Sequence, residues 1–496
     1  MMHTPLKVLS FTIATVAIGA CDLDRLVDDG ADPDPITRVD PKDAPSPEPA
    51  DATPSARDAY GSRIGSFFDV FVDEDRAVTD RGPLVSGGGL QAAPRSRALA
   101  TGWGHTCATL ATSGDVYCWG YNAWADLGDR TQLHRAHPVQ AQGLSDVDAV
   151  AAGAGHTCAL RDGNVVCWGD ERYGQTGSCD TTVEPWPPEL VPSPVVGLPL
   201  GRASAIAAGE AHTCALVDGG VMCWGDNLFA QLGSGQQGGA RAWADWVPGI
   251  GAGSGVRAIG AGFYHTCAAF EGGGVKCWGN DTFCQTGQGP DCNMGGVGPG
   301  NVVLLNLSED VVQIAGGGLH TCALFEGGSV VCWGASSNGE VGNGKRGIEP
   351  FPVQVTGLED GVSAIAAGES TSCAVRDGAA LCWGSNTWGK LGVGEGAIPP
   401  GCIADATWED MVRLCTVPTP VRGLGADTRS VVAGFDHSCA LMSGGGVRCW
   451  GNGAYGSVGH NRFESYVPEP VPIVWAAFPG PGGTLPPVLV PERCQP

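Results

Sequence analysis

Histidine and cysteine are the residues of this chain whose types and spacing could support chemistry. Seven times between Ala98 and Gly459, a cysteine is followed by a second cysteine that directly precedes a tryptophan. Histidine and cysteine are common zinc ligands, and paired cysteines also form disulfides. In six of the seven copies a histidine stands two residues before the first cysteine, and these are His105, His156, His212, His265, His320 and His437. Their role depends on the elements that carry them.

The spacing within each cysteine pair predicts a β-hairpin. Cys158 and Cys167 flank Asp162-Gly163, and an Asp-Gly turn places them opposite each other on antiparallel strands. Where the spacing grows by one residue, the turn also gains one residue, so the sulfur atoms stay within disulfide reach. The predicted pairs are Cys107–Cys118, Cys158–Cys167, Cys214–Cys223, Cys267–Cys277, Cys322–Cys332, Cys373–Cys382 and Cys439–Cys449. The alternative is pairs of small buried thiols, which an exported protein would not readily keep reduced.

The remaining cysteines lie in loops and at the two ends of the chain. Cys284 and Cys292 flank a short loop, and Cys402 and Cys415 bracket an insert, so each pair is interpreted as a local disulfide. Cys179 and Cys494 are left over. A bond between them is one possibility, but connectivity does not follow from sequence.

The seven-fold repeat predicts an all-β fold. Corresponding cysteines are 51 to 66 residues apart, a length that fits one propeller blade of a few short strands. Each blade is expected to hold the histidine-containing strand, the strand ending in Cys-Trp-Gly, and an outer segment with proline and valine. We expect a seven-bladed β-propeller over residues 97–476 and a tail over 477–496. Val467–Val474 is expected to pair with the first blade and close the ring.

The start of the chain predicts export and lipidation. Residues 1–20 have one lysine and an apolar stretch, as in a signal peptide, and Ile18 to Cys21 resembles the lipobox of bacterial lipoproteins. An ordinary signal peptide is the alternative. Residues 21–96 are expected to be an acidic, proline-rich linker in which Ser66–Val72 forms a short strand against the first blade or a partner motif. Lipidated Cys21 would anchor the protein in a bacterial envelope, at the outer membrane or cell surface rather than the inner membrane, although Asp22 leaves this choice open.

The charge of the chain argues against nucleic acid as a partner. Aspartate and glutamate number 52 against 28 lysines and arginines, which gives a formal net charge of −24. Binding to phosphate backbones requires clustered basic residues. The same charge disfavours direct contact with anionic membranes, which leaves the lipid as the expected membrane contact. Solubility is the simpler explanation of such a charge.

The repeat resembles that of the regulator of chromosome condensation. The resemblance lies in Ala-Gly-x-x-His-Ser/Thr, then Asp-Gly, then Trp-Gly-x-Asn, with Asp226–Gly233 and Ser385–Gly392 as the closest copies of the last part. It covers about 380 residues and implies a seven-bladed propeller. The family includes a nuclear guanine-nucleotide exchange factor, plant light sensors and a secreted bacterial β-lactamase inhibitor, so it does not imply one activity. The paired cysteines and the lipobox depart from the eukaryotic pattern and disfavour exchange activity.

No catalytic motif stands out in the sequence. The six histidines occupy equivalent places in separate blades, which are too far apart to share one zinc ion. The histidines and the repeat tryptophans are therefore interpreted as structural groups. No catalytic residue, metal ligand or cofactor is predicted.

The hairpin geometry predicts one face rich in aromatic residues. Residues just before each histidine strand and just after each Cys-Trp-Gly lie at the same end of the hairpin, opposite the Asp-Gly turn. Aromatic residues on an exposed face often anchor protein interfaces. The predicted anchors are Trp103, Trp124, Tyr173, Phe229, Phe263, Tyr264, Phe283, Leu319, Trp388, Phe435 and Tyr455. The alternative is packing between blades.

The prediction from sequence is therefore a monomeric, lipid-anchored protein-binding module without catalytic activity, whose partner is an unidentified protein. Two alternatives remain. One is an envelope enzyme with a pocket in the propeller channel, and the other is a purely structural surface protein.

Overall fold

The computed structural model describes residues 98–178, 187–292, 296–301, 310–404 and 412–473. The predicted signal peptide, Cys21, the linker, Cys179 and the tail with Cys494 lie outside these residues. Among the described residues, no helix has the length and apolar character needed to cross a membrane.

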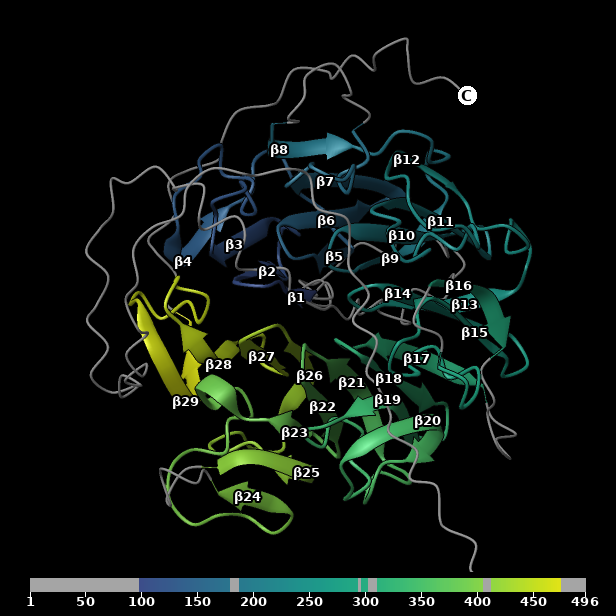
Figure 1. The fold of residues 1–496 in the computed structure, drawn as a ribbon. Coiled ribbons are helices and arrows are strands. Elements are labelled where there is room, and N and C mark those ends of the chain that lie inside the picture. Colours follow the sequence, from purple (N-terminus) through teal and green to yellow (C-terminus); the bar gives the residue numbers. More distant parts are fainter. Residues whose placement is uncertain (1–97, 179–186, 293–295, 302–309, 405–411, 474–496) are drawn as a thin grey trace, which may run out of the picture. The chain divides into compact units, whose positions relative to one another are not determined.

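The described chain forms seven antiparallel sheets in succession (Figure 1). The first blade contains β1 (Leu99–Thr101), β2 (His105–Thr109), β3 (Val116–Gly120) and β4 (Arg135–Gln140). The second contains β5 (Ala149–Ala152), β6 (His156–Arg161), β7 (Asn164–Gly169) and β8 (Glu189–Pro194). The third contains β9 (Ala203–Ala208), β10 (His212–Val217), β11 (Gly220–Gly225) and β12 (Arg241–Trp246). The fourth contains β13 (Val256–Ala261), β14 (His265–Phe270), β15 (Val275–Asn280) and β16 (Gly296–Asn301). The fifth contains β17 (Val311–Gly316), β18 (His320–Phe325), β19 (Val330–Ser336) and β20 (Gly347–Gln354).

The last two blades complete the set. The sixth contains β21 (Val362–Ala367), β22 (Thr371–Arg376), β23 (Ala379–Ser385), β25 (Val412–Pro420) and, at its edge, β24 (Cys402–Ala404), with the short helix η1 (Thr387–Gly389) in a loop. The seventh contains β26 (Thr428–Ala433), β27 (His437–Met442), β28 (Val447–Gly453) and β29 (Glu464–Pro472).

The first strands of the seven sheets contact one another in a closed circuit. β1 contacts β5, each later first strand contacts the next, and β26 contacts β1 again. The predicted all-β, seven-bladed propeller is therefore confirmed. These strands were not anticipated as separate elements. Several of them are rich in alanine, as in Ala149–Ala152 and Ala203–Ala208. Small side chains suit strands that approach their neighbours closely.

The predicted mode of ring closure was wrong. β29 pairs with β28 in its own sheet and not with the first blade. The reason is that β1 already supplies the first strand of the first blade, so that blade needs no strand from the end of the chain. The ring closes instead through contacts of β1 with β26 and β27, and through Trp119 of the first blade, whose Nε1 donates to Ser457 O of the seventh at 2.8 Å.

The hairpins have the predicted register. Cys158 lies opposite Cys167 in the β6–β7 pair, and Asp162 and Gly163 both have positive φ, as a tight Asp-Gly hairpin turn requires. All seven hairpin pairs lie opposite each other with Cα atoms 4.1 Å apart. The Cα atoms of Cys284 and Cys292 are 4.9 Å apart, and those of Cys402 and Cys415 are 3.9 Å apart. The described cysteine pairs are therefore compatible with disulfides.

Candidate functional site

The repeat histidines join each blade to the next. His156 Nε2 lies 2.8 Å from Thr213 Oγ1, and that hydroxyl donates to Gln175 O at 3.1 Å. Because the hydroxyl proton is used there, His156 Nε2 carries the proton and donates to Thr213. Trp224 Nε1 donates to the same carbonyl at 3.0 Å. The other pairs of this kind are His105–Thr157, His212–Thr266, His265–Thr321, His320–Ser372 and His437–Thr106.

Burial keeps these histidines neutral. His156 has no exposed surface, and burial lowers its pKa to about 3. Its Nδ1 faces Gly153, where a Cβ would collide with the imidazole ring. This close approach explains the glycine three residues before the histidine. The predicted structural role of the histidines and tryptophans is confirmed by these contacts, and among the described residues no group of three or more His, Cys, Asp or Glu side chains is placed to hold a metal ion.

The loops next to each histidine strand and after each Cys-Trp-Gly meet at one end of the blade. In the first blade His105 pairs with Gly120, and Tyr121 N donates to Gly104 O at 2.7 Å. We call this end the loop face, and the end with the hairpin turns, such as Asp162-Gly163, the turn face. The predicted aromatic residues lie in the loops of the loop face.

Their exposure differs from residue to residue. Tyr173, Trp388 and Tyr455 are 37–38% exposed. The half-buried residues are Trp103, Trp124, Phe229, Tyr264, Phe283, Leu319 and Phe435. Phe263 is only 3% exposed, so its prediction as an anchor was wrong. Its ring packs edge-on against Tyr264, with centroids 6.0 Å apart, and its carbonyl accepts from Glu210 N of the preceding blade.

Five rings cluster at the seam between the seventh and first blades. Trp103 lies edge-on to Tyr121 at 5.2 Å, and its ring centroid is 6.0 Å from Phe435 and 6.1 Å from Tyr455. Tyr121 also stacks on His134 at 4.8 Å and meets Tyr455 edge-on at 5.1 Å. Tyr121 and His134 were missed from the sequence, although Tyr121 is the only aromatic residue at its position in the seven repeats.

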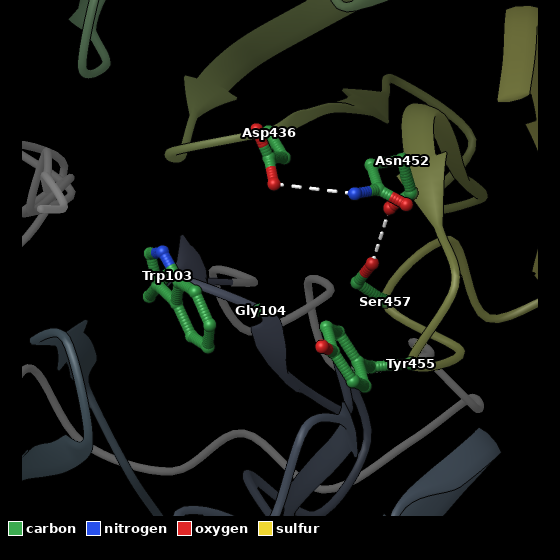
Figure 2. A pocket seen from close by; sticks show the side chains of 6 residues that line it. All are labelled: Trp103, Gly104, Asp436, Asn452, Tyr455 and Ser457. Carbon is green, nitrogen blue, oxygen red and sulfur yellow. Dashed lines mark hydrogen bonds between the residues drawn. The ribbon is translucent and has the colours of Figure 1, made fainter. Parts of the chain in front are cut away.

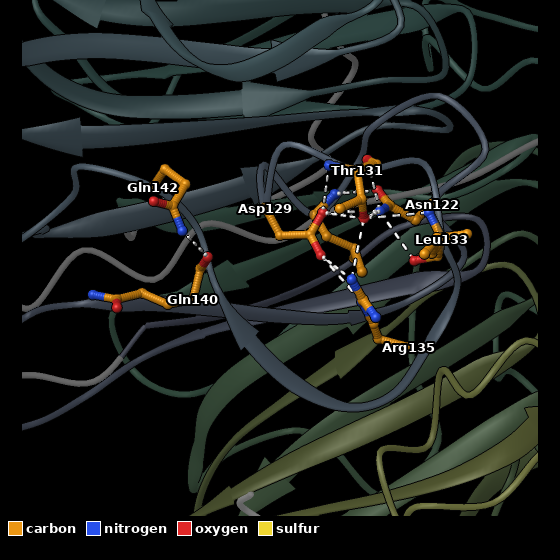
Figure 3. Close-up of polar contacts among 8 residues, drawn as sticks. Asn122, Asp129, Thr131, Leu133, Arg135, Gln140 and Gln142 are labelled. Carbon is orange, nitrogen blue, oxygen red and sulfur yellow. Dashed lines mark hydrogen bonds and ion pairs between the residues drawn. The ribbon is translucent and has the colours of Figure 1, made fainter. Parts of the chain in front are cut away.

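A polar loop of the first blade positions His134 in this cluster. Figure 3 shows the contacts of Asn122, Asp129 and Arg135 within that loop. Asn122 Nδ2 donates to Leu133 O at 3.1 Å, and Asn122 N donates to His134 Nδ1 at 3.0 Å. Arg135 donates to Asp129 through Nε and Nη2, at 3.1 and 3.0 Å. The hydrogen-bonded loop therefore holds His134 as a neutral acceptor, and burial lowers its pKa.

A shallow hollow opens beside the cluster. It is lined by Trp103, Gly104, Asp436, Asn452, Tyr455 and Ser457. Figure 2 shows the Asp436 carboxylate and the rings of Trp103 and Tyr455 around the same space. Asn452 Nδ2 donates to Asp436 at 3.2 Å, and burial raises the pKa of Asp436 to about 6 despite the nearby Lys390. A half-buried carboxylate beside aromatic rings suits a cationic or hydrogen-bonding group.

At the first–second seam a comparable aromatic surface is already covered. The Arg172 guanidinium carbon lies 3.9 Å from the centroid of Trp124. Arg172 Nε and Nη2 donate to the two carboxylate oxygens of Asp170 at 2.9 and 2.8 Å. The predicted alternative of packing between blades therefore applies to Trp124, and also to Phe229, whose centroid is 5.0 Å from that of Tyr264 in the next blade.

Comparisons with known proteins agree with this architecture. A model of the RCC1-like domain matches residues 80–408, and models of the regulator of chromosome condensation (RCC1) repeat match residues 377–441 and 429–457. The chain is 31% identical to the human E3 ubiquitin-protein ligase HERC2 over 264 residues, which is 52% of this chain and 5% of HERC2. It is also 31% identical to the ultraviolet-B receptor UVR8 of Arabidopsis thaliana over 277 residues, 54% of this chain and 60% of UVR8. The matched regions thus span less than two thirds of either relative.

Solved structures show the same fold at lower identity. Prp20p from Saccharomyces cerevisiae has a TM-score of 0.63 at 24% identity, covering 73% of this chain and 86% of Prp20p. Human WBSCR16 has a TM-score of 0.60 at 21% identity, covering 73% of this chain and 94% of WBSCR16. Because the RCC1-like domain model matches more than half of the sequence, and the seven blades carry its repeat, this chain belongs to the RCC1-like domain family.

Proposed function

We propose that this protein is a lipid-anchored propeller of the bacterial envelope whose loop face binds a protein partner, without catalytic activity of its own. The observation that carries the proposal is the ring cluster at the seventh–first seam, where Tyr455 remains 38% exposed beside the hollow with Asp436. Large aromatic side chains with a nearby polar group are typical interface anchors.

Relatives with this fold support a binding role. Prp20p was studied for its binding to Gsp1p and histones, and yeast RCC1 was solved bound to Kap60. Those partners belong to the yeast proteins. The general point is that a propeller gives a stiff frame on which loops of several blades are held together. Of the aromatic residues predicted as anchors on the loop face, the most exposed are Tyr173, Trp388 and Tyr455, from the second, sixth and seventh blades.

The test is to cross-link the full chain to its partner in envelope preparations, identify that partner, and measure the affinity of purified variants. We expect Tyr455→Ala and Trp388→Ala each to weaken binding by about 2 kcal/mol or more if they are anchors. Asp162→Asn and Asp218→Asn on the turn face are the controls, because asparagine tolerates the positive φ of 47° and 48° at these positions. Loss of binding in the turn variants but not in the aromatic variants would show that the partner binds the other face.

Anchoring is tested separately at Cys21, which ends the lipobox-like sequence Ile18-Gly19-Ala20-Cys21. The wild-type protein should incorporate labelled fatty acid and partition into detergent, since several acyl chains hold a protein on a membrane. Cys21→Ser should abolish labelling and either release a soluble protein or leave the precursor unprocessed. A wild-type protein that is secreted without lipid contradicts the anchor.

A further inference from the structure

The first–second seam contains a complete binding arrangement for a guanidinium group. Trp124 stands five residues after the repeat tryptophan of the first blade, and Arg172 stands four residues after that of the second. The guanidinium lies 3.9 Å from the centroid of the Trp124 ring while Asp170 accepts two of its hydrogen bonds. One face of the cation is thus covered by an aromatic ring and one edge by a carboxylate.

The equivalent place at the seventh–first seam has the aromatic ring but, within the part of the chain that the structure describes, no arginine at the position of Arg172. Tyr455 corresponds to Trp124, and Ala123 corresponds to Arg172. Alanine is too short to cover the Tyr455 ring, which is 38% exposed. The position of Asp170 is taken by Tyr121, so the nearest carboxylate of the hollow is that of Asp436 from the seventh blade.

The hollow is shallow, and the two rings that line it pack against each other. The ring of Trp103 is tilted by 34° from that of Tyr455, and their centroids are 6.1 Å apart. Gly104 lies on the lining between them, and a Cβ there would stand 3.0 Å from Tyr121 Cβ and 3.8 Å from Tyr455 Cδ2. A side chain at this position would therefore crowd Tyr121 and the Tyr455 ring beside the hollow.

The charges around Asp436 favour an incoming cation. Lys390, from the sixth blade, is the neighbouring positive group, and its Nζ already donates to Glu369 Oε2 and Phe435 O at 3.1 and 2.9 Å. When both carboxylates are ionised, Glu369 and Asp436 carry two negative charges, and Lys390 balances only one of them. The hydrogen bond from Asn452 holds the Asp436 carboxylate in place at the hollow.

We propose that an arginine side chain of the partner protein packs over this shallow hollow, where it stacks on the exposed part of the Tyr455 ring beside Trp103 and pairs with Asp436. The inference rests on the proposed function for its partner, but the chemistry of the hollow can be tested alone. Arginine fits better than lysine because a planar guanidinium stacks on a ring while its edge donates to a carboxylate. Arg172 provides the internal precedent.

Acetyl-arginine-amide is the probe, and acetyl-citrulline-amide is its neutral isostere. The full chain is labelled with 5-fluorotryptophan, the Trp103 resonance is assigned by comparison with Trp103→Phe, and each probe is titrated by ¹⁹F NMR. The Trp103 resonance should move with acetyl-arginine-amide and saturate. It should respond at least about tenfold more weakly to acetyl-citrulline-amide and to acetyl-lysine-amide. An unmoved resonance, or an equal response to either control probe, overturns the proposal.

Asp436→Asn provides the variant test, with Asp162→Asn on the turn face as the matched control. Asp436→Asn should weaken arginine binding about tenfold or more, and Asp162→Asn should leave it unchanged. Binding should also weaken as pH falls below about 6, where Asp436, flanked by Lys390 and Glu369, takes up a proton. Unchanged binding in Asp436→Asn overturns the role of the carboxylate. If the wild-type protein binds the arginine probe but the Tyr455→Ala and Trp388→Ala variants still bind the partner protein normally, the proposed function is wrong, whereas the arginine preference of the hollow stands.

Discussion

Lys390 Nζ lies 3.1 Å from Glu369 Oε2 at the seam between the sixth and seventh blades. At this seam, alone among the described seams, the repeat histidine is replaced, and Thr371 stands at its position. The side chain of Lys390 is 2% exposed and also donates to Ser370 Oγ and Phe435 O. Its backbone carbonyl accepts from Trp450 Nε1 at 2.9 Å, as in the other seams. A lysine thus joins the two blades where the histidine contact is missing.

Lys390→Met should destabilise the propeller by about 2 kcal/mol or more, because it leaves Glu369 without its buried partner. The expected loss is below that of a fully buried pair, since the Glu369 side chain is 26% exposed. Chemical denaturation followed by tryptophan fluorescence measures the change. Thr371→His combined with Lys390→Gln recreates the pattern of the other seams and should be more stable than Lys390→Gln alone. Equal stabilities would show that the sixth–seventh seam does not need a histidine.

Thr213→Val should cost about 1–3 kcal/mol of folding free energy. The change leaves the buried Nε2 proton of His156 without an acceptor and removes the hydroxyl donated to Gln175 O. Thr416→Val is the matched control, because its hydroxyl bonds only to Gly401 O in an exposed setting. The two variants are compared by urea denaturation, and similar losses would contradict a special role for the seam hydroxyl.

The folding stability should fall as pH drops below about 6.5. Burial lowers the pKa of His156 from 6.5 to about 3, so the unfolded chain takes up a proton that the folded chain does not. The stabilising contribution is therefore complete above pH 6.5 and is lost as pH falls toward 3.

His156→Gln removes one of the six buried repeat histidines, and the side-chain amide of glutamine can still donate to Thr213. Between pH 6 and pH 4, the slope of unfolding free energy against pH should be smaller in this variant than in the wild type. The difference between the two slopes should be about 1.4 kcal/mol per pH unit. Denaturant titrations at several pH values measure both slopes. Identical slopes would mean that His156 titrates alike in the folded and unfolded chains.

The hairpin cysteines should be oxidised once the protein has been exported, as proposed above. Their Cα atoms are 4.1 Å apart in every pair, as in Cys158–Cys167 and Cys373–Cys382. Alkylation without reductant, followed by mass spectrometry, should leave all fourteen unmodified. A Cys158→Ala/Cys167→Ala variant should lose less than the roughly 3 kcal/mol expected for a 15-residue loop, because its loop is shorter. Alkylation of most of these cysteines would refute the prediction.

The hairpins could be predicted from sequence because their determinants are local. The Asp162-Gly163 turn and the spacing of Cys158 and Cys167 fix the register without knowledge of other blades. The first strands were missed because a segment such as Ala149–Ala152 is short and shows no alternation of polar and apolar residues. Its burial arises from two neighbouring blades, which a local pattern does not report.

The loop face was predicted only in outline for the same reason. The strand register shows that Phe263 and Tyr264 lie at this end of the blade, but their exposure depends on residues from adjacent blades. Phe263 is buried, whereas Tyr264 contacts Phe229 and remains partly exposed. Asp436 was not singled out, because its position beside Trp103 and Tyr455 appears only when the last repeat meets the first.

Each described sheet is built only from strands that follow one another along the chain. No described sheet combines a strand from the start of the propeller with strands from its end. The sequence order of the blades is therefore not required by the pairing of any strand. Joining β29 to β1 through a linker and opening the chain between β12 and β13 would leave every sheet and every seam with the same partners. The architecture is thus suited to circular permutation, in which new chain ends lie between two blades while the closed ring of seven is kept.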